Sequence, residues 1–250
     1  MTMPTYRYRI QIEYDGTPFH GWQRQENLPT VQASIEDALK ALSGKKTLVE
    51  GAGRTDTGVH ATGQIGHFDL DKFFPACRLK DALNFYLKGK GVVILGVQEA
   101  APDFHARFSA VSRTYRYDIV NRRTPLALDH LRAWHVIPKL DVEQMQKAAY
   151  TFVGNHDFSA FRSADCQGKS PLKTLLQFDL KQEDEKITAI IKARSFLHNQ
   201  VRIMMGTLKK IGEGKWTDQD LVRILKSGDR TLAGPTAPPH GLYLIDVGYE

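Results

Sequence analysis

The residue types best suited to chemistry lie in one glycine-rich stretch, Gly51-Ala52-Gly53-Arg54-Thr55-Asp56-Thr57-Gly58. Its three glycines allow the backbone to turn tightly and a ligand to approach closely. A guanidinium and a carboxylate, Arg54 and Asp56, stand one residue apart in this stretch. Short strands are predicted on either side, over Thr47–Glu50 and Gly63–Leu70. Asp56 is therefore expected on a loop between two strands, where scaffolds tend to carry functional residues.

Three kinds of site compete for this loop. A dinucleotide or phosphate site is disfavoured, because Asp56 occupies the place of the third glycine of that fingerprint and the next segment is strand-like. No Gly-Lys-Ser/Thr string follows either. Two interpretations stay open: Asp56 caps a turn by accepting from nearby backbone N–H groups, or it is a catalytic carboxylate whose ionised form an arginine holds.

Composition places the chain among ordinary globular proteins, with 250 residues, 42% hydrophobic and 25% charged. This length accommodates one large domain or two of ordinary size. Cys77 and Cys166 are far apart and lack metal-ligand spacing, which fits a reducing cytoplasm, and the scattered histidines predict no metal site. The N-terminal Met1–Tyr6 lacks the apolar run of a signal peptide, and no stretch reaches the length of a membrane span.

The charge favours a polyanionic partner. Lys and Arg exceed Asp and Glu by 34 to 28, which gives a net charge of +6. Arginines also alternate with aromatic residues, a combination that stacks on unpaired bases and neutralises phosphates. Each such stretch alone could equally be a half-buried strand. The three stretches are Tyr6-Arg7-Tyr8-Arg9, Phe104-His105-Ala106-Arg107-Phe108 and Arg113-Thr114-Tyr115-Arg116-Tyr117.

Hydrophobic periodicity predicts an α+β fold with helices on one face of a mainly antiparallel sheet. In the first half we expect strands over Tyr6–Tyr14 and Val92–Gln98, a helix over Val31–Leu42 between Thr30 and Gly44, and a helix over Cys77–Leu87. In the second half we expect strands over Arg113–Asn121, His130–Val136, Thr174–Lys181, Lys186–Ala193 and Gly241–Val247, a long polar loop over Asn155–Ser163, and helices opened by Asp141 and Thr217 and led by Phe196–Gly206.

Five stretches, taken in order, carry a resemblance to a known family. They are Gly21-Trp22-Gln23-Arg24, Gly53-Arg54-Thr55-Asp56-x-Gly58-Val59-His60-Ala61, Phe104-His105-Ala106-Arg107-Phe108-Ser109, Arg113-x-Tyr115-Arg116-Tyr117 and Asn199-Gln200-Val201-Arg202-x-Met204-Met205-Gly206. Together they resemble the TruA family of tRNA pseudouridine synthases, from about Tyr8 to Tyr249. The sequence departs from the family at 84–88, where a Leu-Pro turn is expected.

The resemblance implies a fold of two tandem RRM-like (ferredoxin-like) halves. Residues 1–103 would carry the aspartate loop, and residues 104–250 would complete the active site. The halves would form one extended antiparallel sheet with helices on one face and a central cleft. The resemblance further implies a homodimer, with neither cofactor nor metal. Its substrate would be uridine at positions 38, 39 and 40 of the tRNA anticodon stem-loop.

The resemblance also assigns roles to five residues. Asp56 would be the catalytic nucleophile or base, and Arg202 would pair with it. Tyr115 would stack against the target uracil and Leu242 would line the pocket. Arg54 would occupy the space that the flipped base leaves. Taken singly, Arg202 could be a surface cation and Tyr115 a core residue of a half-buried strand.

Two other functional classes remain as alternatives. A non-catalytic RNA-binding protein with two RRM-like units would explain the basic aromatic strands, but it would not explain the Gly-Arg-Thr-Asp loop. A glycoside hydrolase would need a pair of carboxylates flanking the bond, and no second acid accompanies Asp56 in this loop. Isomerisation of uridine fits a lone carboxylate, because the reaction involves no redox change and no group is lost.

Overall fold

The computed structural model describes residues 5–164, 166, 168 and 170–250, which form two compact units. Unit 1 comprises the residues up to Val111 together with Leu244–Glu250, and unit 2 comprises Ser112–Tyr243. Residues 104–111 and the last seven residues therefore belong to unit 1, whereas the sequence-based division places them in the second half. Residues 1–4 of the stretch inspected for a signal peptide lie outside the described residues.

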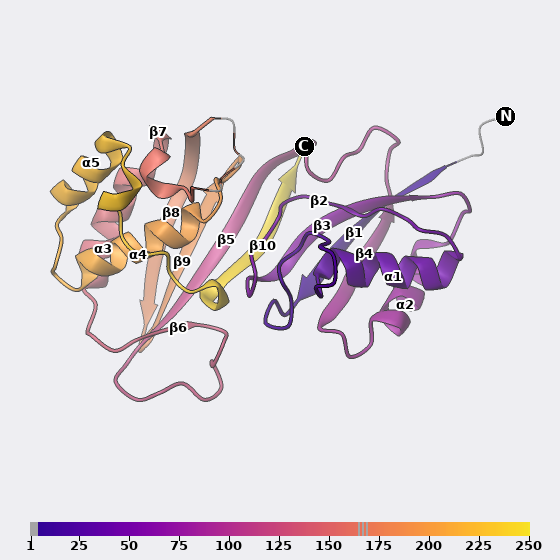
Figure 1. Ribbon diagram of the computed structural model, residues 1–250, viewed down its shortest axis with the longest axis horizontal. Helices are drawn as coiled ribbons and strands as arrows, with labels where there is room; N and C mark the ends of the chain where they lie inside the picture. The colour runs from indigo at the N-terminus through magenta and orange to yellow at the C-terminus, as the bar shows by residue number, and fades with distance from the viewer. Residues whose placement is uncertain (1–4, 165, 167, 169) are drawn as a thin grey trace. The chain divides into compact units, whose positions relative to one another are not determined.

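Unit 1 is an α+β unit, as predicted (Figure 1). Its sheet has the order β4-β1-β3, with β10 also on β3, and β2 pairs antiparallel with β3. Strand β1 is antiparallel to both β3 and β4, while α2 packs against β4 and α1. The elements are β1 (Tyr6–Tyr14), α1 (Val31–Ser43), β2 (Glu50–Gly51), β3 (His60–Leu70), α2 (Ala76–Leu87), β4 (Val92–Glu99) and most of β10 (Leu242–Tyr249).

The ends of α1 follow from its flanking residues. Thr30 precedes the helix in an extended conformation, and its side chain accepts a hydrogen bond from the Ala33 N–H at 3.3 Å. Gly44 ends the helix with a φ of +74°, in the left-handed region that glycine adopts readily. Both predicted boundary residues are confirmed.

The strand predicted over Thr47–Glu50 is wrong for most of its length, because β2 contains only Glu50 and Gly51. The reason lies at Val49. Its N–H donates to the Glu36 carboxylate at 3.1 Å, and its carbonyl accepts from the Gln32 side chain at 3.1 Å. With both backbone groups bonded to helix side chains, Val49 is not part of the ladder.

Unit 2 is also α+β, with the sheet order β5-β9-β8-β7 and a short strand, β6, parallel to β5. Strands β5, β9, β8 and β7 pair antiparallel, and α3 packs against α4, α5 and β8. The elements are β5 (Ala110–Asn121), β6 (Trp134–Val136), α3 (Val142–Ala149), η1 (Tyr150–Phe152), β7 (Gly154–Asp157), η2 (Ser159–Phe161), β8 (Leu172–Glu183), β9 (Lys186–Ala193), α4 (Gln200–Gly212), α5 (Asp218–Ser227), η3 (Arg230–Leu232) and η4 (Pro239–Gly241). None of the helices in the described part of the chain is long and apolar enough to cross a membrane.

The long polar loop predicted over 155–163 is wrong, because the segment forms β7 and η2. Phe158 and Phe161 from this segment are fully buried. The Phe161 ring meets the Phe152 ring at 5.0 Å between centroids, edge to face, and Phe152 stacks on Phe178 at 5.7 Å. Two aromatic residues three apart thus anchor a segment whose other residues are largely polar, and burial of these rings outweighs the polar composition.

This aromatic cluster predicts a large and local stability effect. Phe161→Ala should lower the free energy of unfolding by about 3–5 kcal/mol, because it removes a buried ring and leaves a cavity. Leu128→Ala is the matched control, since Leu128 is 94% exposed. Urea denaturation measures both variants, and equal stability of Phe161→Ala and Leu128→Ala would contradict the buried cluster.

Candidate active site

The Asp56 loop begins where β2 ends and closes where β3 starts. Gly51 of β2 pairs with Gly66 of β3, and the Ala52 N–H donates to the Ile65 carbonyl at 2.7 Å. The predicted position of Asp56 on a loop between two antiparallel strands is confirmed. Within this loop the Asp56 side chain is half-buried and Arg54 is exposed.

Thr55, the residue before Asp56, is fixed through both its main chain and its side chain. Its carbonyl accepts from the Trp22 N–H at 3.0 Å. Its hydroxyl shares a hydrogen bond of 2.8 Å with the Tyr14 hydroxyl, and both groups are buried. Burial raises the pKa of Tyr14 above its usual range, so the phenol stays neutral. The residue pattern predicts Tyr14 only as the end of a strand, and nothing near it in the sequence indicates its bond to Thr55.

The chain turns directly after Asp56. The Val59 N–H donates to the Asp56 carbonyl at 3.1 Å, which closes a four-residue turn. Gly58, third in that turn, has a φ of +77°, which a type II turn requires at this position. The main chain of Asp56 thus takes part in the turn. Earlier in the loop, the Gly53 carbonyl accepts a hydrogen bond of 2.8 Å from Gln64 Nε2.

The stretch Gly21-Trp22 comes unusually close to the Asp56 loop. Gly21 has a φ of +87°, and a Cβ atom built on it would lie 2.6 Å from the Thr55 carbonyl oxygen. Likewise, a Cβ on Gly51 would lie 2.5 Å from the Trp22 ring. Both glycines are therefore required by close approach, and the Gly-Trp pair that the sequence singled out supports the loop that carries Asp56.

His60 fixes the far end of the loop. Its ring is buried and its Nδ1 accepts a hydrogen bond of 3.0 Å from the Gly16 N–H. The same Nδ1 lies 3.2 Å from the Asp15 carboxylate, so the imidazole contacts both residues that follow β1. A Cβ on Gly16 would lie 2.1 Å from the Val59 carbonyl, so the segment that follows β1 also meets the loop through a glycine.

The remaining predicted site residues belong to unit 2. Tyr115 lies on β5, is buried, and meets the Phe196 ring edge to face at 5.2 Å between centroids. Leu242 is buried at the start of β10, directly after η4. The Tyr115 ring is thus supported on one side by a second aromatic ring, an arrangement that restricts its orientation.

Arg202 is half-buried on α4 and is held by two defined acceptors. Its Nε donates to the Ala237 carbonyl at 2.7 Å, and its Nη1 donates to the Asn199 side chain at 2.7 Å. The Ala237 N–H in turn donates to the Arg202 carbonyl at 3.0 Å. These contacts orient the planar guanidinium, which distinguishes it from a solvated surface cation.

The structure thus brings Arg54 and Asp56 together on one loop of unit 1. Tyr115, Arg202 and Leu242 are placed in unit 2. The pairing of Asp56 with Arg202 stays a prediction. Among the described residues there is no group of three or more His, Cys, Asp or Glu side chains that could hold a metal.

Some arginines of the three basic aromatic stretches contact other residues of their own unit. Arg7 makes a bidentate ion pair with Asp69, at 2.7 Å for each bond. Arg9 instead lies over the Tyr249 ring at 4.6 Å, and Arg116 lies over the Tyr243 ring at 4.5 Å. Arginine stacking on aromatic rings therefore occurs within each unit, and these contacts fix the strands that bear the residues.

Comparison with known proteins gives one consistent result. A family model described as tRNA pseudouridine synthase matches residues 10–109 and 148–250. A protein of Paramagnetospirillum magneticum named tRNA pseudouridine synthase A is 53% identical over 98% of this chain and 95% of its own length. A protein of the same name from Afipia carboxidovorans is 51% identical over 97% of this chain and 99% of its own length.

The close approach at Gly21 predicts a stability effect that exceeds the cost of a left-handed backbone alone. Gly21→Ala should lower the free energy of unfolding by about 2–5 kcal/mol, since it combines backbone strain with a collision against Thr55. Gly44→Ala is the matched control, because Gly44 is equally left-handed but has open space around it. Its cost should be about 1–2 kcal/mol. Chemical denaturation tests this, and equal costs would refute the contact.

Proposed function

This chain belongs to the tRNA pseudouridine synthase family, and we propose that it converts uridine to pseudouridine at positions 38, 39 and 40 of the tRNA anticodon stem-loop. Membership of the family makes it an isomerase that acts on tRNA. The observation that supports the catalytic site best is the Asp56 loop, in which Trp22 holds the Thr55 main chain and Tyr14 holds the Thr55 side chain. The alternative of a non-catalytic RNA-binding protein does not explain why this loop carries Arg54 and Asp56.

The reaction defines what the site must do. The bond between N1 of uracil and C1′ of the ribose breaks, the freed base turns, and its C5 joins C1′. The proton on C5 is lost and N1 gains one, so the atoms balance without oxidation or reduction. A single carboxylate suffices, either by attacking the sugar or base or by removing a sugar proton.

We assign that carboxylate to Asp56. A reacting group must be held close to its productive position, and misplacement by about 1 Å can cost on the order of 100-fold in rate. The bonds to Thr55 and the turn closed by Val59 support this assignment, because they fix the Asp56 backbone on both sides. A glycine-rich loop without such bonds would not hold a side chain in one place.

Arg202 is the proposed cationic partner of Asp56. A site that excludes water disfavours an ionised carboxylate, and a nearby guanidinium counters this effect. The bonds from Arg202 to Ala237 and Asn199 support the role, since they orient the guanidinium before substrate binds. A guanidinium that is already oriented loses less conformational entropy when it pairs with a carboxylate.

The other predicted residues act on the base. A uracil must leave its stack before reaction, at a cost on the order of a few kcal/mol. Arg54 would fill the space left behind, and its exposure on the loop supports this. Tyr115, braced by Phe196, would present an aromatic face to the turning uracil, and Leu242 would line the same pocket.

The finer architecture is part of the proposal. Unit 1 runs β1-α1-β2-β3-α2-β4, with the sheet order β4-β1-β3 and the short strand β2 also paired with β3, which supports an RRM-like half. In unit 2, once the short strands β6 and β7 are set aside, the order β5-β9-β8 repeats the same arrangement of first, third and second strands. We propose that the two halves form one extended sheet with a central cleft. The protein would work as a cytoplasmic homodimer, and its two free cysteines fit a reducing compartment.

Substitution of the aspartate tests the catalytic assignment. Asp56→Asn keeps the side-chain shape and removes the charge, so pseudouridine formation in bulk tRNA should fall below detection while tRNA binding is retained. Asp81→Asn makes the same chemical change on the exposed face of α2 and should leave turnover unchanged. Mapping of pseudouridine after treatment with each protein gives the result, and turnover near the wild-type rate in Asp56→Asn would refute the assignment.

A further inference from the structure

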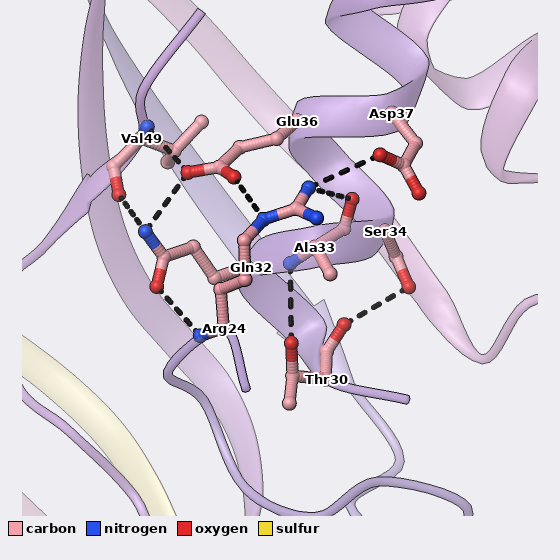
Figure 2. Close-up of polar contacts among 8 residues, drawn as sticks. All are labelled: Arg24, Thr30, Gln32, Ala33, Ser34, Glu36, Asp37 and Val49. Carbon is pink, nitrogen blue, oxygen red and sulfur yellow. Dashed lines mark hydrogen bonds and ion pairs between the residues drawn. The ribbon is translucent and has the colours of Figure 1, made fainter. Parts of the chain in front are cut away.

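A buried carboxylate of α1 joins the two segments that lead to the Asp56 loop. Figure 2 shows Glu36 between Arg24, which follows Trp22 closely in sequence, and Val49, which directly precedes β2. The Glu36 side chain is 9% exposed, although α1 also has a solvated face. By sequence alone this glutamate is indistinguishable from a surface residue of an amphipathic helix.

Glu36 accepts three hydrogen bonds. Its Oε2 accepts from Arg24 Nε at 2.6 Å, which is also an ion pair. Its Oε1 accepts from the Val49 N–H at 3.1 Å and from Gln32 Nε2 at 2.8 Å. Both oxygens are therefore acceptors only, a requirement that a carboxylate meets and an amide does not.

Gln32, one helical turn earlier, bonds to the same two segments. Its Oε1 accepts from the Arg24 N–H at 2.9 Å, and its Nε2 donates to the Val49 carbonyl at 3.1 Å (Figure 2). The Gln32 backbone N–H also donates to the Trp22 carbonyl at 3.0 Å. The pair of side chains thus binds the backbone of both segments, which makes a rigid bridge rather than a single contact.

The bridge continues to the residue next to Asp56. Trp22, whose carbonyl is held by Gln32, donates its own N–H to the Thr55 carbonyl. On the other arm, Val49 leads directly into β2, and the Trp22 ring packs against Gly51 of that strand. Glu36 is therefore bonded to both segments that support the Asp56 loop, through Arg24 on one arm and Val49 on the other.

Stability alone does not account for a charged bridge of this kind. The Glu36 carboxylate is desolvated while the Arg24 side chain is 47% exposed. Burial of a charge costs free energy that offsets the attraction of its partner, and contact with solvent weakens that attraction further. The outer contact of Arg24 with Asp37, at 3.1 Å, is largely exposed and adds little. What the bridge provides is a defined direction and distance for each bonded backbone group.

We propose that Glu36 is a positioning residue for the isomerisation, acting through Arg24, Val49 and Thr55 to hold Asp56 in its reactive place. This inference rests on the proposed role of Asp56. Glu36→Gln puts an amide NH₂ where one oxygen accepted, so it sets a donor against a donor at Arg24 or at Val49. The loop then loses one of its two supports while its own residues stay intact.

The test compares Glu36→Gln with a matched variant in the same unit. Asn84 on α2 clamps β4 in a similar way, with its Nδ2 donating to the Ile94 carbonyl at 2.9 Å and its Oδ1 accepting from the Ile94 N–H at 2.8 Å. Asn84→Asp sets an acceptor against the Ile94 carbonyl, away from β2 and the Asp56 loop. Single-turnover pseudouridine formation on saturating tRNA, the Kd for tRNA, Tm and hydrogen exchange at Trp22 and Val59 are measured for each.

We expect Glu36→Gln to lower the single-turnover rate about 10- to 100-fold, with the Kd for tRNA within about twofold of wild type. Exchange at Trp22 and Val59 should become faster. Asn84→Asp should lower Tm by about as much as Glu36→Gln does. It should leave the single-turnover rate and the hydrogen exchange at Trp22 and Val59 unchanged. Arg24→Lys, at a half-exposed position, keeps the charge but not the planar fork, and it should fold and show a smaller loss of rate in the same direction.

Equal rates in the wild type, Glu36→Gln and Arg24→Lys would overturn the inference, as would equal rate losses in Glu36→Gln and Asn84→Asp. Asp56→Asn, assayed in parallel, separates this failure from that of the proposed function. If Asp56→Asn is inactive while Glu36→Gln is fully active, only the positioning role fails. If Asp56→Asn is itself active, the catalytic assignment fails.

Discussion

The hydrogen bond from the Trp22 N–H to the Thr55 carbonyl is the contact on which the site depends. A loop rich in glycine can come close to a ligand, but the conformational freedom of its backbone would leave its side chains without a fixed position. Here that freedom is removed by bonds from outside the loop: Trp22 and Tyr14 hold Thr55, and Gln64 holds Gly53. Glycines remain where a side chain would block these approaches, as at Gly21. The glycines would make the loop that carries the proposed catalytic acid flexible, but hydrogen bonds from residues outside the loop hold it in one conformation.

Features governed by neighbouring residues were predictable from the sequence. The ends of α1 follow from Thr30 and Gly44, because capping depends on residues directly at the helix ends. Strand β1 was predicted over Tyr6–Tyr14 from the alternation of its residues, and Tyr8, Ile10 and Ile12 are buried in it. The segment 155–163 was not predictable, since the burial of Phe158 and Phe161 is decided by rings elsewhere in unit 2.

In the candidate site, too, features set by neighbouring residues were predictable and features set by distant residues were not. The Asp56 loop was evident from its composition, and its place between strands follows from local patterns. The support of that loop was not evident, because its contacts join residues distant in sequence: Tyr14 with Thr55, and Glu36 with Val49. Val49 illustrates the physical reason. Local propensity predicted a strand there, but two helix side chains occupy its backbone groups.

The proposed pairing of Asp56 with Arg202 beside a flipped uracil is tested most directly by a crystal structure of the full chain bound to an anticodon stem-loop RNA. We expect the Asp56 carboxylate to lie about 2.7–2.9 Å from the Arg202 guanidinium, the distance of a charge-assisted hydrogen bond, with the target base out of its stack and against Tyr115. An Asp56 carboxylate pointing into bulk solvent, with Arg202 remote and the uracil still stacked in the RNA, would contradict the mechanism.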